Sequence, residues 1–173
     1  MASCGSNINV PEKTIPISKD ASWNNAYHIM DKLMNSELGF KDYQAAGIVG
    51  NIFAESRWNP TTVNPNDRGM ESIGLCQWRA KRNTKLKEKA NETNKSWTDL
   101  DLQVDYLIEE LKGTKNESLN AILTQSTVED AANIFCCKFE VAGECYNKDC
   151  SKRPTNRIGY SKDFLSKWRA RNK

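Results

Sequence analysis

The chain has 173 residues, of which 38% are hydrophobic and 27% are charged, and its formal net charge is +3. This length suits one well-buried core and is short for two, so we expect one globular domain. This mild charge, with both signs intermixed, suits an anionic partner without demanding one, and we expect no nucleic-acid partner. No run approaches the ~20 apolar residues of a membrane helix, so we expect no membrane span.

Residues 1–18 have no periodic pattern and predict a flexible N-terminal arm, which leaves residues 19–173 as the folded domain. The arm lacks the basic segment and apolar core of a secretory signal peptide. Export would therefore need another route, or another part of a longer protein.

A first helix is predicted after Ser22, which suits an N-cap, and it should end before Gly39. Its inward positions recur at helical spacing; they are Trp23, Tyr27, Met30, Met34 and Leu38. His28, the single histidine of the chain, lies on this helix, where a packed or solvated role is favoured over a catalytic one.

The second helix, residues 43–56, should be the buried central helix of the core, because residues 45–54 leave almost no polar face. Gly47 and Gly50 would each cost up to about 1 kcal/mol relative to alanine in a helix interior. Such glycines are tolerated where another backbone or a ligand comes close. We therefore expect close packing along this helix.

Glu55 falls in the last turn of this helix, because Asn59-Pro60 should stop it. Removing a carboxylic acid from water raises its pKa, and an acid that stays protonated near neutral pH can donate a proton to a leaving group. The alternative is a structural glutamate bonded to a helix end or to an arginine such as Arg57 or Arg82. This stretch by itself favours neither.

Residues 61–74 are rich in Asn, Pro, Asp and Gly, which predicts a small irregular or β-hairpin segment. Irregular backbone beside a helix end that carries a carboxylate is where substrate clefts are commonly built. The remaining periodic segments predict helices over residues 80–91, 97–111, 119–123 and 127–143, and a last helix that carries Ile158, Leu165 and Trp168. The domain is therefore predicted to be mainly α.

Four of the six cysteines crowd near the end of the chain, namely Cys136, Cys137, Cys145 and Cys150. The neighbours Cys136 and Cys137 are poorly placed to bond each other and should face different ways on one helix. The spacing matches no standard zinc pattern, so structural disulfides or free thiols are favoured over a metal site.

Several of these residues together resemble a known family. Glu55-Ser56, Asn59-Pro60 and then Gly74-Leu75-Cys76-Gln77 are similar to the E-S-x-x-N-P … G-L-x-Q signature of goose-type lysozymes and soluble lytic transglycosylases. The fuller pattern, AAGIVGNIFAESRWNP with GLCQW and Arg82, resembles the phage tail lysozyme family. The likeness continues through LDLQVDYLIEEL, then FCCKFE and Arg157, so it covers most of the chain from about residue 23.

This resemblance implies a lysozyme-like fold and cleavage of the β-1,4 bond between N-acetylmuramic acid and N-acetylglucosamine in peptidoglycan, without metal or cofactor. Glu55 matches the catalytic acid of the family. Gln77 matches a glutamine that lines the cleft, whose amide can donate and accept hydrogen bonds to a sugar N-acetyl group. Trp78 either stacks on a sugar face or anchors the loop from the core. Glu140 matches a recurring glutamate and is a candidate cleft residue.

Hydrolysis also needs a second group, either a nucleophile about 5 Å from the acid or a base roughly 6.5–9.5 Å away. Asp67 and Glu71 are the favoured candidates because their loop should border the cleft, ahead of Asp99 and Asp101. Surface solvation is the ordinary alternative for each.

Other functions are consistent with the same residues. A lytic transglycosylase would use the 6-hydroxyl of the substrate and leave 1,6-anhydro ends. A non-catalytic wall-binding tail module would keep the fold without the chemistry, and a chitinase would cleave the related polymer. The resemblance implies a protein of the virion tail or extracellular space that acts on the bacterial wall, alongside other tail or wall-spanning machinery proteins. A conjugation or secretion component and an endolysin are the alternatives.

Overall fold

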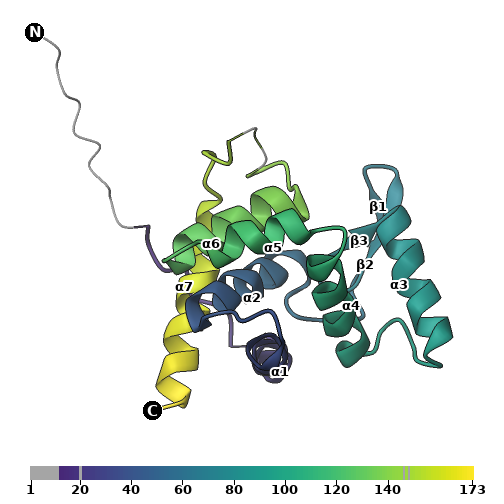
Figure 1. Cartoon of the computed structure of the whole chain (residues 1–173), viewed down its shortest axis with the longest axis horizontal. Coiled ribbons are helices and arrows are strands. Elements are labelled where there is room, and N and C mark those ends of the chain that lie inside the picture. The colour runs from purple at the N-terminus through teal and green to yellow at the C-terminus, as the bar shows by residue number, and fades with distance from the viewer. Residues whose placement is uncertain (1–11, 20, 146, 148) are drawn as a thin grey trace, which may run out of the picture.

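The computed structural model describes residues 12–19, 21–145, 147 and 149–173 (Figure 1). The helices are α1 Trp23–Asn35, α2 Asp42–Ser56, α3 Lys81–Glu92, α4 Leu100–Lys112, α5 Asn116–Leu123, α6 Val128–Ile134, the π-helix η1 Phe135–Glu140, and α7 Thr155–Arg171. The strands β1 Val63–Asp67, β2 Met70–Ile73 and β3 Trp78–Arg79 form one antiparallel sheet in that order. The predicted mainly α, lysozyme-like fold is confirmed.

Helix α2 is the central helix, and α1, α6 and α7 pack around it (Figure 1). Its two glycines lie where neighbouring backbones touch it, since a Cβ atom on Gly47 would lie 2.7 Å from the backbone nitrogen of Ala132 in α6. A Cβ atom on Gly50 would lie 2.5 Å from the Cα atom of Ser161 in α7. The close packing predicted from these glycines is therefore confirmed.

Helix α2 ends because the chain turns left-handed after Ser56. Arg57 and Trp58 both have positive φ angles, 54° and 61°. Trp58 folds back onto the helix, where its ring is fully buried and its indole N–H donates to the carbonyl oxygen of Val49 at 2.8 Å. Glu55 thus lies in the last turn, as predicted.

The hairpin predicted near residues 61–74 is formed by β1 and β2. Arg68 and Gly69 connect them with positive φ angles, as a two-residue type I′ turn requires. The third strand, β3, was not predicted, because two residues are too few to show an alternating pattern. It ties the GLCQW segment to the hairpin.

Helix boundaries differ from the predicted ones where tertiary contacts replace helical ones. Helix α1 ends at Asn35, and Leu38 reaches the core from the following loop. Helix α5 begins three residues earlier than predicted. The segment predicted as one helix over residues 127–143 is α6 followed directly by η1, which ends at Glu140.

Two disulfides join η1 to the loop that follows it. Cys136 bonds Cys145, and Cys137 bonds Cys150. The neighbouring cysteines therefore take different partners, as expected. Cys76 is a buried free thiol, and Cys4 lies outside the described residues.

Part of the predicted N-terminal arm, residues 1–11, lies outside the described residues, and its flexibility stays a prediction. Residues 12–18 run along α7, where the N–H of Ile17 donates to Asp163 Oδ2 at 2.9 Å and Ile17 is buried. In the described part of the chain, no helix is long and apolar enough to cross a membrane.

Candidate active site

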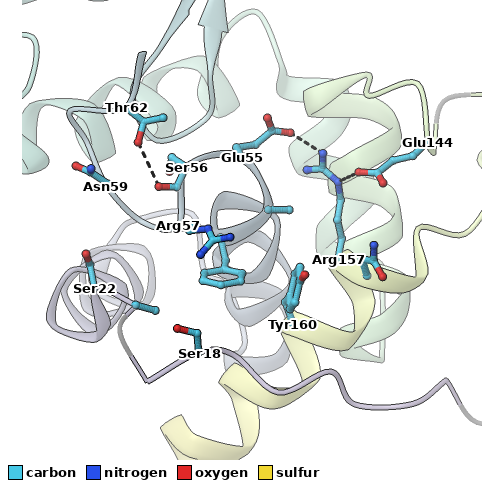
Figure 2. A pocket seen from close by; sticks show the side chains of 14 residues that line it. Ser18, Ser22, Glu55, Ser56, Arg57, Asn59, Thr62, Glu144, Arg157 and Tyr160 are labelled. Atoms are coloured by element: carbon cyan, nitrogen blue, oxygen red, sulfur yellow. Dashed lines mark hydrogen bonds and ion pairs between the residues drawn. The ribbon is translucent and has the colours of Figure 1, made fainter. Parts of the chain in front are cut away.

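Glu55 lies between two cavities at the surface, of about 660 and 560 Å³. The side chains of Glu55, Glu144 and Arg157 line both of them, so the two cavities form one cleft that passes Glu55 on either side. Figure 2 shows the first cavity, with Tyr160 of α7 on one wall and Asn59 on the other side of the α2 end.

Arg157 of α7 holds the Glu55 carboxylate in place. Its Nη2 atom lies 2.7 Å from Glu55 Oε1, and the two side chains are 7% and 17% exposed (Figure 2). The same guanidinium donates through Nε to Glu144 and through Nη1 to Asn51 Oδ1 at 3.3 Å. Neither Arg57 nor Arg82, the partners considered from the sequence, forms this ion pair, since Arg57 is exposed and Arg82 binds another carboxylate.

Glu140, the last residue of η1, lines the second cavity. Its Oε1 atom is buried and accepts no hydrogen bond within the described part of the chain. Burial, reinforced by the negative charge of Glu55, raises the pKa of Glu140 to about 8, against the opposing effect of Arg82 and Arg157. The site therefore disfavours the ionised form of Glu140.

An ion pair between the half-buried Arg82 and a buried carboxylate supports the wall behind Glu140. Glu110 of α4 is 6% exposed and accepts from Arg82 Nε at 2.7 Å and Nη2 at 2.8 Å. It also accepts from the indole N–H of Trp78 at 2.7 Å. Arg82 lies over the ring of Phe139, 4.6 Å from its centroid. These contacts fix α3, α4 and η1 relative to one another.

Gln77 lines the second cavity, and its amide also holds the loop that carries it. Its Oε1 accepts from Ser72 Oγ at 2.9 Å, and its NH₂ donates to the carbonyl oxygens of Gly74 and Thr62. Trp78 has no face open to a sugar, because its ring is fully buried and packs edge-on against Tyr106. Its burial supports the other role considered, a core tryptophan that anchors the loop.

The sequence matches the pattern of the phage tail lysozyme family over residues 24–167, which include Glu55, Gln77, Glu140 and Arg157. The chain belongs to the phage tail lysozyme family. A comparison with curated proteins gives no match. Membership of this family makes the protein a lysozyme-like enzyme whose substrate is peptidoglycan.

In this member of the phage tail lysozyme family, Asp67 and Glu71, the two residues predicted from the sequence as the second catalytic carboxylate, lie in different places. Asp67, at the end of β1, lines the second cavity, 3.8 Å from Arg79. Glu71 is exposed on β2 and lines neither cavity; hydrogen bonds from Lys87 and Asn83 lower its pKa. Of the two, the structure brings only Asp67 to the cleft.

The remaining candidates lie elsewhere. Asp99 caps α4 by accepting from the backbone N–H of Leu102, and Asp101 pairs with the exposed His28 and with Lys32. The solvated role expected for His28 thus agrees with its position. The residue whose role the sequence did not reveal is Glu144, because its position beside Arg157 depends on how the disulfide-bonded loop folds.

Proposed function

We propose that the protein is a muramidase that cleaves the β-1,4 bond between N-acetylmuramic acid and N-acetylglucosamine, with Glu55 as the general acid. The observation that carries this proposal is the place of Glu55, at the end of a buried helix and in the lining of both cavities. Sugars on the two sides of a glycosidic bond would fill the two cavities. The oxygen between them would then lie at Glu55.

The surroundings of Glu55 suit proton donation in a fixed direction. Its helix is packed on nearly all sides, and Arg157 holds its Oε1 atom, so the carboxyl group has little freedom to rotate away. Once Glu55 has given up its proton, the same guanidinium stabilises the carboxylate that is left.

Asp67 is the proposed second carboxylate, because it borders the same cleft. In hydrolysis it would activate or orient the water that attacks the sugar. We assign Gln77 to the substrate-binding wall, where its side chain also keeps the loop in shape. We propose no catalytic role for Glu71, since it lines neither cavity and its carboxylate is bound by Lys87 and Asn83 of α3.

Replacing Glu55 with glutamine tests the proposal, because the amide keeps the shape of the carboxyl group but has no proton to donate. Wild-type protein should release soluble fragments from purified peptidoglycan, with reducing ends detected by mass spectrometry. Glu55→Gln should lower the rate by about 10²–10⁴-fold or more. Its melting temperature should stay close to the wild-type value. Full activity of this variant would refute the assignment.

The same digest separates the other functions. Fragments with 1,6-anhydro ends would identify a lytic transglycosylase, in which Glu55 would act first as acid and then as base. Wild-type protein that pellets with peptidoglycan but releases nothing would identify a wall-binding module. Activity on chitin oligomers would indicate a broader substrate.

We further propose that the enzyme acts from a phage tail, where it would open the wall locally from outside the cell. The family is described as phage tail lysozymes, which supports this place of action. Its partners would then be peptidoglycan strands and neighbouring tail proteins. Immunogold labelling of virions is the direct measurement, and label confined to lysed-cell supernatant would favour an endolysin instead.

A further inference from the structure

Glu140 is a buried carboxyl group that the proposed reaction does not yet use. The two guanidiniums nearest to it are already bound to other carboxylates, Arg82 to Glu110 and Arg157 to Glu55 and Glu144. Ionisation of Glu140 would add a fourth carboxylate to a cluster that has only two guanidiniums. A neutral Glu140 avoids that charge and matches the unpaired, buried Oε1 atom.

The backbone at Glu140 has two uncommon features, a π-helical turn before it and a left-handed residue after it. Glu140 ends a π-helix, a form that is rare and frequently found at functional sites. The next residue, Val141, is β-branched and has a φ angle of 55°, in the left-handed region that such residues rarely adopt. This strain persists because the segment is fixed elsewhere, by the buried ring of Phe139 and by the two disulfides from Cys136 and Cys137.

Titratable and charged groups surround Glu140 from several elements. Those that share the second cavity with it are Glu55 of α2, Asp67 of β1, Arg68 of the hairpin turn, Cys76 before β3, Arg79 of β3, Arg82 of α3, Glu144 of the disulfide-bonded loop, and Arg157 of α7. Glu110 of α4 and Lys115 before α5 also act on it electrostatically. Among them, Glu55 is the negative charge with the largest effect on Glu140. The charge of Glu55 therefore acts directly on the ionisation of Glu140.

We propose that Glu55 and Glu140 hold one proton between them at neutral pH, and that Glu140 stores, as a neutral carboxylic acid, the proton that Glu55 delivers. This inference rests on the proposed role of Glu55 as the general acid. Glu140 does not donate to the substrate itself. It acts through Glu55, by holding the proton that Glu55 passes on.

The proton can be followed through the whole reaction. In the resting enzyme it is on Glu140, and Glu55 is the carboxylate paired with Arg157. The proton moves to Glu55, which leaves the charge of the pair unchanged, and then to the glycosidic oxygen as the bond from that oxygen to C1 breaks. Two carboxylates then face the positive charge that develops on the sugar. Water oriented by Asp67 adds its hydroxyl group to C1, and its remaining proton returns to the pair.

The test is the pH dependence of peptidoglycan cleavage by wild-type protein and by Glu140→Gln, which mimics the neutral acid but cannot exchange a proton. The wild-type rate should fall on the alkaline side near pH 8, where the pair loses its last proton. In Glu140→Gln the alkaline fall should move to lower pH by about one unit or more, because Glu55 is left alone beside a guanidinium. Glu37→Gln is the matched control, since Glu37 is exposed and pairs only with Lys112 among the described residues; its profile should follow the wild type.

A Glu140→Gln enzyme that is slower at every pH but keeps the wild-type alkaline fall would overturn the proposal, because a purely structural role predicts that result. A second measurement needs no variant. In wild-type protein labelled with ¹³C at the glutamate carboxyl carbons, NMR should show one carboxyl group that stays protonated at neutral pH and loses its proton near pH 8. The proposal fails if every glutamate has released its proton by about pH 6. Absence of wall cleavage by the wild type would instead refute the proposed function, and the NMR titration could still be read.

Discussion

The contact between α2 and α7 at Gly50 links core packing to the site, because α2 carries Glu55 and α7 carries Arg157. A Cβ atom at position 50 would lie 2.5 Å from both the Cα and the N atom of Ser161, and closer still to its Oγ. Ordinary contacts between such atoms need about 3.5 Å, so Gly50→Ala requires the two helices to separate by about 1 Å. A backbone cannot rotate away as a side chain can.

The expected loss of stability follows from two opposing effects. Overpacking of this kind costs about 3 kcal/mol, at the upper end of its usual range, and the better helix propensity of alanine returns about 1 kcal/mol. The net loss of about 2 kcal/mol should lower the melting temperature by about 4–8 °C for a chain of this size. Calorimetry and urea unfolding measure both quantities.

Gly50→Ala should also slow the enzyme, beyond its effect on the free energy of unfolding. A shift of about 1 Å between Glu55 and Arg157 can slow a reaction on the order of 100-fold, measured as kcat/KM on purified peptidoglycan. Adding Ser161→Gly should restore only part of the loss, because the close approach of the Cα and N atoms remains. A Gly50→Ala protein that is more stable than the wild type and fully active would refute the reasoning, since helix propensity would then be the only effect.

Three further perturbations test other parts of the structure. Glu110→Ala should lose about 3 kcal/mol in urea unfolding, because it leaves the half-buried Arg82 charge and the buried Trp78 N–H without their partner, and wild-type stability would contradict this. Reduction of the two disulfides should remove about 2.5–3 kcal/mol each and slow wall lysis by loosening the backbone that carries Glu144. Thiol counting confirms the reduction, and an unchanged melting temperature would contradict the expectation. Because folded Glu140 keeps a proton that the unfolded chain releases above its ordinary pKa of 4.5, the stability of wild-type protein relative to Glu140→Gln should decrease as the pH rises towards about 8; a constant difference would exclude the raised pKa.

Much of the fold follows from local patterns in the sequence. The apolar residues and the two glycines of α2 predicted a buried helix in close contact with its neighbours, and both features are present. The Asn, Pro, Asp and Gly of residues 61–74 predicted the hairpin. The π-helical end of the α6 segment was not predicted, because it depends on the two disulfides and on the packing of Phe135 and Phe139, which stack 4.5 Å apart.

The candidate site was only partly predictable. The sequence placed Glu55 at a helix end, and its ordered match to the family included Gln77, Glu140 and Arg157. It offered Trp78 both as a sugar-stacking residue and as a core residue, and only its full burial separates the two roles. Spacing along the chain equally could not separate Asp67 from Glu71, because they lie on adjacent strands but face different surroundings.

The sequence by itself determined the family, the mainly α architecture and the helix end that carries Glu55, since these depend on local periodicity and on motifs of neighbouring residues. The tertiary structure decided the protonation pattern of the site. Glu55 and Arg157 are 102 positions apart in the chain yet 2.7 Å apart in space, and Glu140 approaches them from η1. The charge on a carboxyl group depends on burial and on the charges around it in three dimensions. That is why the sequence pointed to Glu55 as the buried acid, whereas the fold makes Glu140 the carboxyl group that stays neutral.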